Sequence, residues 1–513
     1  MNPDTQVLIC GGRRMSGSTL RLNAARAAAG FAALGVGQGD AVAVMMRNDL
    51  AYLEAMLAVN RLGAYLVAVN WHFQADEAGF LLADSGAKVL VIHADLWPQV
   101  AAVVPPHVMV ITVETPAEIG SAYGVASGEP ALPEGMLRWA DWRDRHEPWR
   151  AAPVPSLGSL LYTSGTTGRP KGVMRLPGTP AQHAGQLRVR ALVNRAREGM
   201  RTAIVGPLYH AGPNAGARLA LEMADVIVVM PRFEAEPLLQ AIEHYRLTHL
   251  SLVPVMLVRL LKLSRAVRER YDVSSLENAT HGGSPCPPEV RRAMIDWWGP
   301  ILTETYGSTE AGLVTLGTSE SWLRFPGTVG KPVDGFSLRI VDGEGRVLPP
   351  GEVGEIYVHP GDNALPFTYK NDPELRQSIE RDGHITNGDM GYLNAEGYLF
   401  ITDRKRDMVI SGGVNIYPAE IEHVLLAHPE VLDAAVFGIP DAEYGEALAA
   451  AVVAAPGRTP TQDSIRQWVR ERLAGYKVPK VVDFHASLPR EGMGKLFKNQ
   501  LRAPYWADAG RKI

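Results

Sequence analysis

The fold class is indicated by a strand–helix–strand pattern that begins with Ala41-Val-Ala-Val-Met-Met46, continues through a helical segment at residues 48–62 and ends with Leu66-Val-Ala-Val-Asn70. A third apolar run of the same kind follows at Lys88-Val-Leu-Val-Ile-His93. Apolar strands that alternate with helices are typical of βαβ units, which assemble into a parallel sheet covered by helices. We therefore predict an α/β fold.

The pattern of apolar runs changes twice along the chain. A second set of βαβ-type runs spans residues 203–254, so we expect two sheets of this type in the N-terminal part. Near residue 330 the runs become short and alternating, as in Ser337-Leu-Arg-Ile-Val341 and Gly354-Glu-Ile-Tyr-Val358, with turn residues between them. Such runs are typical of antiparallel hairpins, and they predict a small β-barrel-like subdomain.

A smaller α+β unit follows the charged run Asp403-Arg-Lys-Arg-Asp407. At 513 residues the chain is too long for one ordinary core, so more than one domain is expected. We predict a large N-terminal domain at residues 1–403, a hinge at residues 404–406 and a mobile C-terminal domain at residues 407–513.

The composition is that of an ordinary globular protein. The chain has 51 Lys and Arg against 55 Asp and Glu, and this balance does not favour nucleic acid as a partner. The two cysteines, Cys10 and Cys286, lie far apart without the spacing of metal ligands, which favours a reducing compartment. The most apolar run, residues 447–456, is about half the length of a membrane span. We expect a cytoplasmic protein with no transmembrane segment and no targeting signal.

The most informative functional signal is Tyr162-Thr-Ser-Gly-Thr-Thr-Gly-Arg-Pro-Lys171, which follows an apolar run. Its glycines allow backbone N–H groups to approach phosphate oxygens, its hydroxyl side chains add donors, and Lys171 adds a positive charge. The loop differs from a Walker A loop, because Lys171 follows Arg169-Pro170 and precedes Gly172. These residues predict a phosphate-binding loop.

This loop resembles the phosphate loop of the adenylate-forming superfamily, which includes acyl-CoA synthetases, luciferases and the adenylation domains of peptide synthetases. Further motifs of that superfamily follow in order, namely Thr305-Tyr-Gly-Ser-Thr-Glu310, Asn387-Gly-Asp389, Asp403-Arg404, Ser411-Gly-Gly-Val-Asn-Ile-Tyr-Pro-Ala-Glu420 and Pro489-Arg-Glu-Gly-Met-Gly-Lys495. The resemblance covers nearly the whole chain. It implies an ATP-dependent acid–thiol ligase that activates a carboxylic acid as its acyl-adenylate.

The resemblance also implies roles for single residues. Thr309 would bond the α-phosphate and Glu310 would hold Mg²⁺, because a carboxylate beside a triphosphate is costly unless a metal lies between them. Asp389 would accept hydrogen bonds from the ribose hydroxyls, and Tyr306 would stack on adenine. The residues implied for binding ATP and AMP are Thr163, Ser164, Gly165, Thr166, Thr167, Gly168, Lys171, Gly283, Ser284, Pro285, Thr305, Tyr306, Gly307, Asp389 and Arg404.

By the same resemblance, Lys495 reaches the reacting carboxylate and the α-phosphate in the adenylation step and neutralises the charge that develops there. Lys495 belongs to the C-terminal unit, so this unit has to close over the larger one. Arg406 occupies the hinge position, where relatives more often carry Asp or Lys.

The acid pocket implied by the resemblance has small walls. His210 would stand at its mouth, and the implied lining residues are Ala211, Gly212, Gly282, Gly307 and Gly312. Small walls leave room for a large acid. Since no Lys or Arg is among these positions to pair a second carboxylate, we expect a hydrophobic monocarboxylic acid, which can be long-chain, aromatic or polycyclic.

The thiol acceptor implied by Ser411, Gly412 and Gly413 is coenzyme A, because backbone without side chains lets the pantetheine arm approach closely. One departure is His72 in Asn70-Trp-His72, where many relatives carry an arginine. The implied partners are a small carboxylic acid and CoA, and a homodimer is allowed.

Two alternatives to an acyl-CoA ligase stay open. One is a stand-alone enzyme that loads a carrier protein, and the other is a P-loop NTPase or kinase, which would release ADP. A catalytically silent homologue is disfavoured because Lys171, Glu310, Asp389 and Lys495 are all retained.

Overall fold

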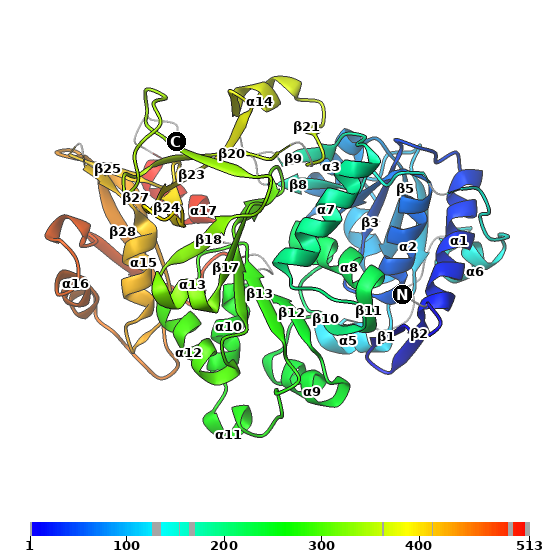
Figure 1. Ribbon diagram of the computed structural model, residues 1–513, viewed down its shortest axis with the longest axis horizontal. Coiled ribbons are helices and arrows are strands. Elements are labelled where there is room, and N and C mark those ends of the chain that lie inside the picture. Colours follow the sequence, from blue (N-terminus) through cyan, green and yellow to red (C-terminus); the bar gives the residue numbers. More distant parts are fainter. Residues whose placement is uncertain are drawn as a thin grey trace.

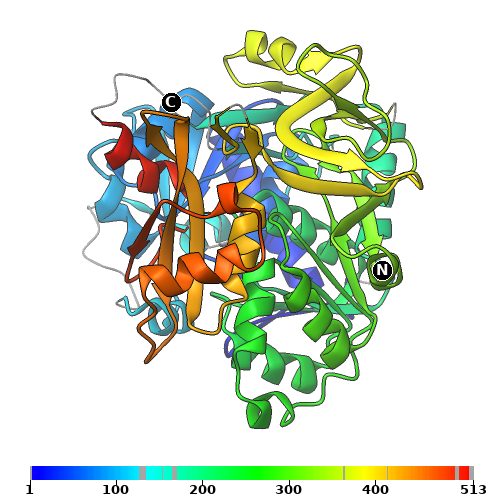
Figure 2. The same ribbon diagram turned by 90° about the vertical axis from the view of Figure 1, so that its left-hand side faces the viewer.

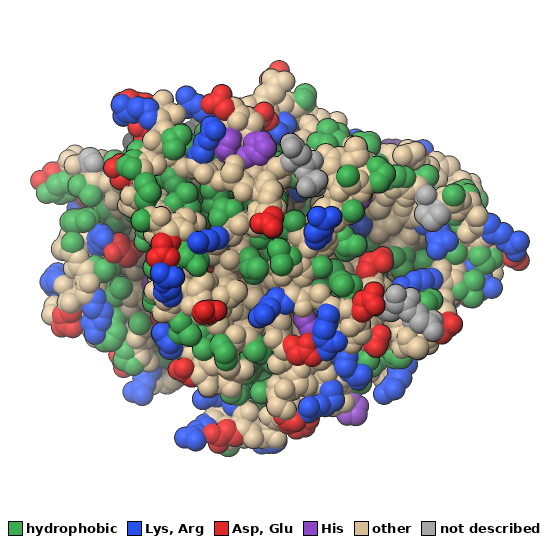
Figure 3. Space-filling view, in the orientation of Figure 1, with side chains coloured by type: hydrophobic (Ala, Val, Ile, Leu, Met, Phe, Trp, Pro, Cys, Tyr) green, Lys and Arg blue, Asp and Glu red, His purple; other side chains and the backbone are tan. Residues whose placement is uncertain are grey.

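The computed structural model describes residues 3–125, 135–152, 154–163, 170–361, 364–412, 414–490 and 496–507. It has a large N-terminal part with two sheets and their covering helices, and a small C-terminal part, coloured orange to red, that lies against the first (Figures 1 and 2). On the face in Figure 3, acidic and basic side chains are interspersed, so this face carries no large field of one sign. No helix in the described ranges is long and apolar enough to cross a membrane.

The first sheet contains the predicted runs as adjacent parallel strands. Its strands are, in spatial order, β21 (Phe367–Tyr369), β9 (Lys171–Arg175), β8 (Ser159–Thr163), β4 (Tyr65–Ala68), β3 (Ala41–Met45), β5 (Ala87–His93), β6 (Met109–Val113) and β7 (Leu137–Arg138). The pairs from β8 to β7 are parallel, whereas β9 runs antiparallel to both β8 and β21. The predicted α/β class is therefore confirmed.

The second sheet joins a parallel half to an antiparallel half. Its strands are, in spatial order, β19 (Ser337–Val341), β20 (Gly354–His359), β23 (His384–Leu393), β24 (Leu399–Arg404), β18 (Thr328–Pro332), β17 (Thr315–Thr318), β14 (Leu302–Thr305), β13 (Asn278–Gly282), β12 (His249–Leu252), β10 (Met200–Ile204), β11 (Ala224–Val229), β1 (Val7–Cys10) and β2 (Arg13–Ser16). The short β22 (Glu380–Arg381) pairs with β23, and β15 (Gly307–Ser308) pairs with β16 (Gly312–Leu313). The predicted antiparallel hairpins are present, and they extend the second sheet beyond β14.

Helices cover both sheets. Those of the N-terminal part are α1 (Gly17–Ala33), α2 (Leu50–Arg61), α3 (Ala75–Ser85), α4 (Trp97–Val100), α5 (Ala117–Tyr123), α6 (Trp139–Asp144), α7 (Pro180–Val193), α8 (Ala211–Met223), α9 (Ala235–Tyr245), α10 (Pro254–Leu261), α11 (Arg265–Arg268), α12 (Pro288–Trp298), α13 (Ser319–Arg324) and α14 (Pro373–Ser378). Short 3-10 turns lie at Ala94–Leu96 and Gly475–Lys477. The helix expected at residues 48–62 is α2, which begins at the side-chain cap Asp49.

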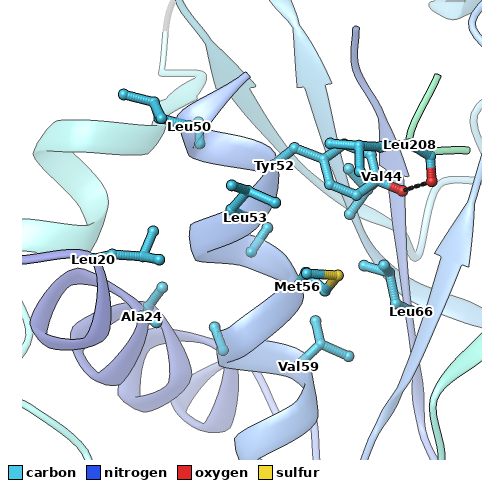
Figure 4. Packing of buried hydrophobic residues seen from close by; sticks show 14 of the residues in the cluster. Leu20, Ala24, Val44, Leu50, Tyr52, Leu53, Met56, Val59, Leu66 and Leu208 are labelled. Carbon is cyan, nitrogen blue, oxygen red and sulfur yellow. Dashed lines mark hydrogen bonds between the residues drawn. The ribbon is translucent and has the colours of Figure 1, made fainter. Parts of the chain in front are cut away.

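The largest hydrophobic core lies between α1, α2 and the first sheet. Leu53 and Met56 of α2 are fully buried and pack among Leu20 and Leu66 (Figure 4). Tyr52 on the same helix donates its hydroxyl to the carbonyl oxygen of Leu208 at 3.0 Å (Figure 4). This bond ties the first sheet to the segment that leads into α8.

Asn48 holds the two sheets together at the ends of their parallel strands. Its side-chain amide donates to the carbonyl oxygens of Gly206 at 2.9 Å and Met230 at 3.0 Å, just beyond β10 and β11. Its carbonyl oxygen accepts from the N–H of Leu208 at 2.9 Å. Asn48 is 2% exposed, and a buried amide satisfied in this way fixes geometry firmly.

The C-terminal part has its own sheet, with β26 (Val414–Ile416), β25 (Val409–Ser411), β28 (Gly445–Ala454) and β27 (Val431–Asp441) in that order and β29 (Val481–Phe484) parallel to β28. Its helices are α15 (Pro418–Leu426), α16 (Gln462–Arg470) and α17 (Lys498–Trp506). The predicted α+β unit is thus present, and the apolar run at residues 447–456 lies largely in β28.

A buried ion cluster ties this unit to the strand that precedes it. Lys498 Nζ lies 2.7 Å from a carboxylate oxygen of Glu422 on α15, with side-chain exposures of 12% and 16%. Burial lowers the pKa of Lys498, but the carboxylates of Glu422, Asp403 and Asp407 outweigh burial and raise it above its usual value. Asp403 also accepts the N–H of Ala419 at 2.9 Å, so β24 and α15 are joined directly.

We predict that Lys498→Met destabilises the C-terminal unit by about 2 kcal/mol, because it leaves largely buried carboxylates without their cation. Urea-induced unfolding checks this value. Arg472→Met is the control, since Arg472 pairs with Glu471 at the surface of the same unit, with side-chain exposures of 39% and 53%. A loss of stability that is the same in both variants contradicts a special role for Lys498.

Candidate active site

A large cleft lies where the two sheets and the C-terminal unit meet. Its volume of about 1730 Å³ exceeds the roughly 300–1,000 Å³ of a typical pocket for one small ligand, so it has room for a nucleotide and a second substrate. The cleft lies beyond the carboxyl ends of β10, β12 and β13, which is where open parallel sheets place their ligands.

The predicted phosphate loop connects two antiparallel strands. Thr163 at the end of β8 pairs with Lys171 at the start of β9, and both residues line the cleft. The loop residues Ser164, Gly165, Thr166, Thr167 and Gly168 lie outside the described residues. A P-loop leads from a strand into a helix, whereas this loop leads from a strand into a strand. The geometry therefore contradicts the P-loop NTPase alternative.

Three of the residues predicted to bind ATP and AMP lie together: Asp389, Arg404 and Tyr306. Asp389 on β23 lies opposite Arg404 on β24, with the Arg404 Nε 3.4 Å from a carboxylate oxygen. The Tyr306 hydroxyl donates to Asp389 at 2.8 Å. Burial, and then the charge of Asp389, raise the pKa of Tyr306 well above its usual value, so the hydroxyl stays protonated and keeps donating. Asp389 is thereby held in one orientation at the cleft.

Thr309 and Glu310 line the cleft beside two residues that sequence reasoning missed. The Tyr369 hydroxyl donates to Glu310 Oε1 at 3.0 Å, and Arg175 donates to the Thr309 carbonyl oxygen at 2.5 Å. Oε2 of Glu310 has no hydrogen-bond partner in the described part of the chain. Mg²⁺ is usually held by one or two carboxylates together with substrate phosphates, and Glu310 fits that requirement.

The positions predicted at the site are occupied by glycine for different reasons. A Cβ on Gly282 would lie 2.5 Å from the Thr305 carbonyl oxygen, and one on Gly307 would overlap the carbonyl oxygen of Gly312. These positions are therefore glycine because two strands approach closely. Gly283 has a φ of +83°, which a turn after β13 requires. Ser284 and Pro285, next in the chain, are exposed and are not among the residues that line the cleft.

The glycines of α8 are small for another reason. Gly212 and Gly216 line the cleft one helical turn apart, and nothing lies within 4 Å of where their Cβ atoms would be. Glycine in a helix costs about 1 kcal/mol relative to alanine, so these two maintain open space rather than a backbone shape. His210 caps the start of α8 and Ala211 begins it; both line the cleft as predicted.

Two arginines outside the positions predicted for the acid pocket also line the cleft. Arg190 on α7 and Arg218 on α8 both line the cleft. Neither belongs to a motif, and the direction of each side chain depends on how its helix packs. The sequence could have indicated Arg218, because Arg218 lies about two helical turns after His210 on α8.

The residues predicted for the hinge and the C-terminal unit divide into three groups. Arg404 and Arg406 line the cleft, together with Phe497 and Gln500 near the start of α17. Ser411 and Gly412 of the predicted CoA loop are not among the residues that line it. Lys495 and Gly413 lie outside the described residues.

Comparisons with known proteins agree with this geometry. The family described as AMP-binding enzyme matches residues 1–365, and the one described as AMP-binding enzyme C-terminal domain matches residues 420–495. A feruloyl-CoA synthase of Amycolatopsis sp is 34% identical over 510 residues, which cover 98% of this chain and 96% of that protein. The fatty acid–[acyl-carrier-protein] ligase ScoC of Streptomyces coeruleorubidus is 31% identical over 527 residues, covering 100% and 95%.

Among solved structures, ATP-bound MatB from Rhodopseudomonas palustris superposes with a TM-score of 0.84 at 28% identity, covering 100% of this chain and 98% of MatB. The order of the motifs, the cleft that gathers their described residues and the matches along the whole chain lead to one conclusion. The chain belongs to the AMP-binding enzyme family and is an AMP-forming acid–CoA ligase family enzyme.

Proposed function

We propose that this chain joins ATP and a large carboxylic acid to form an acyl-adenylate and pyrophosphate, and then transfers the acyl group to coenzyme A with release of AMP. The observation that carries the proposal is the convergence of Thr309, Glu310 and Asp389 on one cleft with both ends of the phosphate loop. Each of these residues suits a different part of an adenylate.

In the first step an acid carboxylate oxygen bonds the α-phosphorus, and the bond from this phosphorus to the bridging oxygen of pyrophosphate breaks. Thr163, the loop at residues 164–168 and Lys171 would hold the departing phosphates. Asp389, held in place by Tyr306, would accept the ribose hydroxyls. When bound at Glu310, Mg²⁺ would neutralise phosphate charge. Lys495 would stabilise the charge that develops between carboxylate and α-phosphate.

In the second step the CoA sulfur bonds the acyl carbon, AMP leaves and the thiol proton is released. For this step we propose that the C-terminal domain, residues 407–513, turns about residues 404–406 relative to residues 1–403. The arrangement described here has Phe497 and Gln500 at the cleft and leaves Ser411 and Gly412 away from it. Such an arrangement suits the adenylation step. Rotation of the C-terminal domain would move Phe497 and Gln500 away from the cleft and bring Ser411 and Gly412 to it.

The acid would enter past His210 and lie along α8. Gly212 and Gly216 leave open space on this helix, which suits a long-chain, aromatic or polycyclic acid. Because Gly282 and Gly307 are needed by strand pairing, the size of the acid is argued from α8 alone.

A second candidate acceptor is the phosphopantetheine thiol of a carrier protein. The observation that favours it is the full-length similarity to ScoC, whose name states a carrier protein as acceptor. Both acceptors present the same thiol, so the adenylation step is common to the two candidates.

We expect acid-dependent formation of AMP and pyrophosphate from ATP, with turnover increased by CoA and not by a carrier protein supplied in its place. Product analysis by chromatography checks all of these expectations. Release of ADP and phosphate would overturn the whole proposal, while stimulation by the carrier protein alone would replace CoA as the acceptor.

We predict that Lys495→Ala lowers adenylation by about 100-fold or more, because a cation at the developing charge is lost, yet leaves the transfer of a supplied acyl-adenylate to CoA intact. The two half-reactions are measured separately, with Lys480→Ala as a surface control in the same unit. Equal loss in both half-reactions would show that Lys495 acts elsewhere.

We predict that Gly216→Leu lowers kcat/KM for large acids by more than about tenfold while acids of two to four carbons are affected little, because the leucine occupies open space in the cleft. The thermal midpoint should not fall, since leucine favours a helix by about 1 kcal/mol over glycine. Gly216→Ala is the conservative control. A uniform loss for short and long acids argues against this position for the acid.

A further inference from the structure

Among the described residues, the side chains of Arg190 and Arg218 face the cleft without a negatively charged partner. Arg218 donates to side-chain oxygens of Asn60 at 2.9 Å, Ser159 at 3.1 Å and Asn214 at 3.3 Å, and all of these acceptors are neutral. The guanidinium group of Arg190 makes no hydrogen bond and no ion pair with any residue in the described ranges, and the side chain lines the cleft. Both side chains are only half-buried, because the cleft itself is open to them.

The surroundings of Arg190 disfavour its charge. Burial, and then the positive charge of Arg218, lower the pKa of Arg190 to about 10. Burial likewise lowers the pKa of Arg218 to about 10. Both guanidinium groups nevertheless stay charged at neutral pH. A desolvated cation without a counter-ion is costly, and such a cost is usually found where a ligand supplies the missing charge.

Arg218 lies well along α8 from His210, and Arg190 faces the same cleft from α7. Arg218 follows His210 by eight residues on α8, which corresponds to about 12 Å along the helix axis. Arg190 lies on the neighbouring helix α7, and its charge also acts on Arg175, beside Thr309. The charges of Arg175, Arg190 and Arg218 act on one another in sequence, so positive charge continues from beside Thr309 to the part of the cleft along α8.

We infer that the acid substrate carries a second carboxylate at its far end, which Arg190 binds while Arg218 holds the pocket wall and adds positive charge. This inference rests on the proposed function and replaces a monocarboxylic acid by a dicarboxylic one. Guanidinium groups bind carboxylates through paired, charge-assisted hydrogen bonds, and the free donors of Arg190 suit this geometry.

The first test compares acids that differ only at the far end. The pairs are 4-carboxycinnamic acid with its distal methyl ester, and two straight-chain dicarboxylic acids with their monomethyl esters, with 4-hydroxycinnamic acid as a neutral hydrogen-bonding analogue. We expect kcat/KM for pyrophosphate release to be about tenfold or more higher for the best diacid than for its ester, mainly through KM. Esters or the hydroxyl analogue that equal every diacid would overturn the inference.

The second test is Arg190→Gln, which removes the charge without costing any hydrogen bond within the protein. We expect KM for the preferred diacid to rise about 10- to 100-fold, with the KM for ATP unchanged and the preference for diacid over ester lost. Arg188→Gln, at an exposed position two residues away on α7, is the matched control and should keep the preference. The thermal midpoint of Arg190→Gln should not fall, since an unpaired charge is removed.

Each remaining outcome has one meaning. An Arg190→Gln variant that loses diacid and ester activity equally shows a structural role, and one that raises the KM for ATP shows that Arg190 binds a phosphate; either result overturns the inference. Binding is checked independently by the diacid raising the thermal midpoint of the wild type more than its ester does. If no acid supports pyrophosphate release, the proposed function itself fails, whereas turnover without a diacid preference rejects only this inference.

Discussion

The buried amide of Asn48 holds the ends of the two sheets together, and the cleft depends on that junction. Asn48 follows β3 of the first sheet, and its side chain donates to backbone carbonyl oxygens just beyond β10 and β11 of the second sheet. The same side chain accepts the N–H of Leu208, two residues before the cap of α8. Because all its polar atoms are satisfied away from water, a shift of either sheet would leave buried groups unpaired, which is costly. One side chain thereby fixes the position of Leu208, two residues before the cap of α8.

The small residues of the cleft show that the same amino acid can answer two constraints. At Gly282 and Gly307 the neighbouring strand leaves no room for a Cβ, so glycine is required by the backbone. At Gly212 and Gly216 the space is open, and glycine even weakens the helix. The second pair is therefore the better guide to the shape of the acid, because nothing in the fold requires it.

The charges of the cleft divide in a similar way. Asp389 is bonded to Tyr306 and lies close to Arg404, Glu310 is bonded by Tyr369, and Arg175 is bonded to backbone carbonyl oxygens. These groups are held in position by the protein before any ligand arrives, which is how a site reduces the cost of reorganisation. Arg190 differs because its positive charge has no partner in the described protein. The bonded groups are fixed by the protein itself, whereas the guanidinium of Arg190 keeps its donors available for a ligand.

The sequence by itself determined the fold class and the order of the motifs, and it singled out residues such as Glu310 and Asp389 that the structure places at the cleft. Apolar runs such as residues 41–46 and 88–93 are local signals that predict strands. Motif residues such as Asp389 are recognised in the same way, from the few residues on either side of them. Only the tertiary structure decided which faces of α7 and α8 meet the cleft, and so revealed Arg190 and Arg218, because the direction of a helical side chain follows from packing against distant strands. It also decided that the start of α17, and not Ser411, lies at the cleft. The placement of one unit against another depends on contacts such as the hydrogen bond from the N–H of Ala419 to Asp403, which no local pattern records.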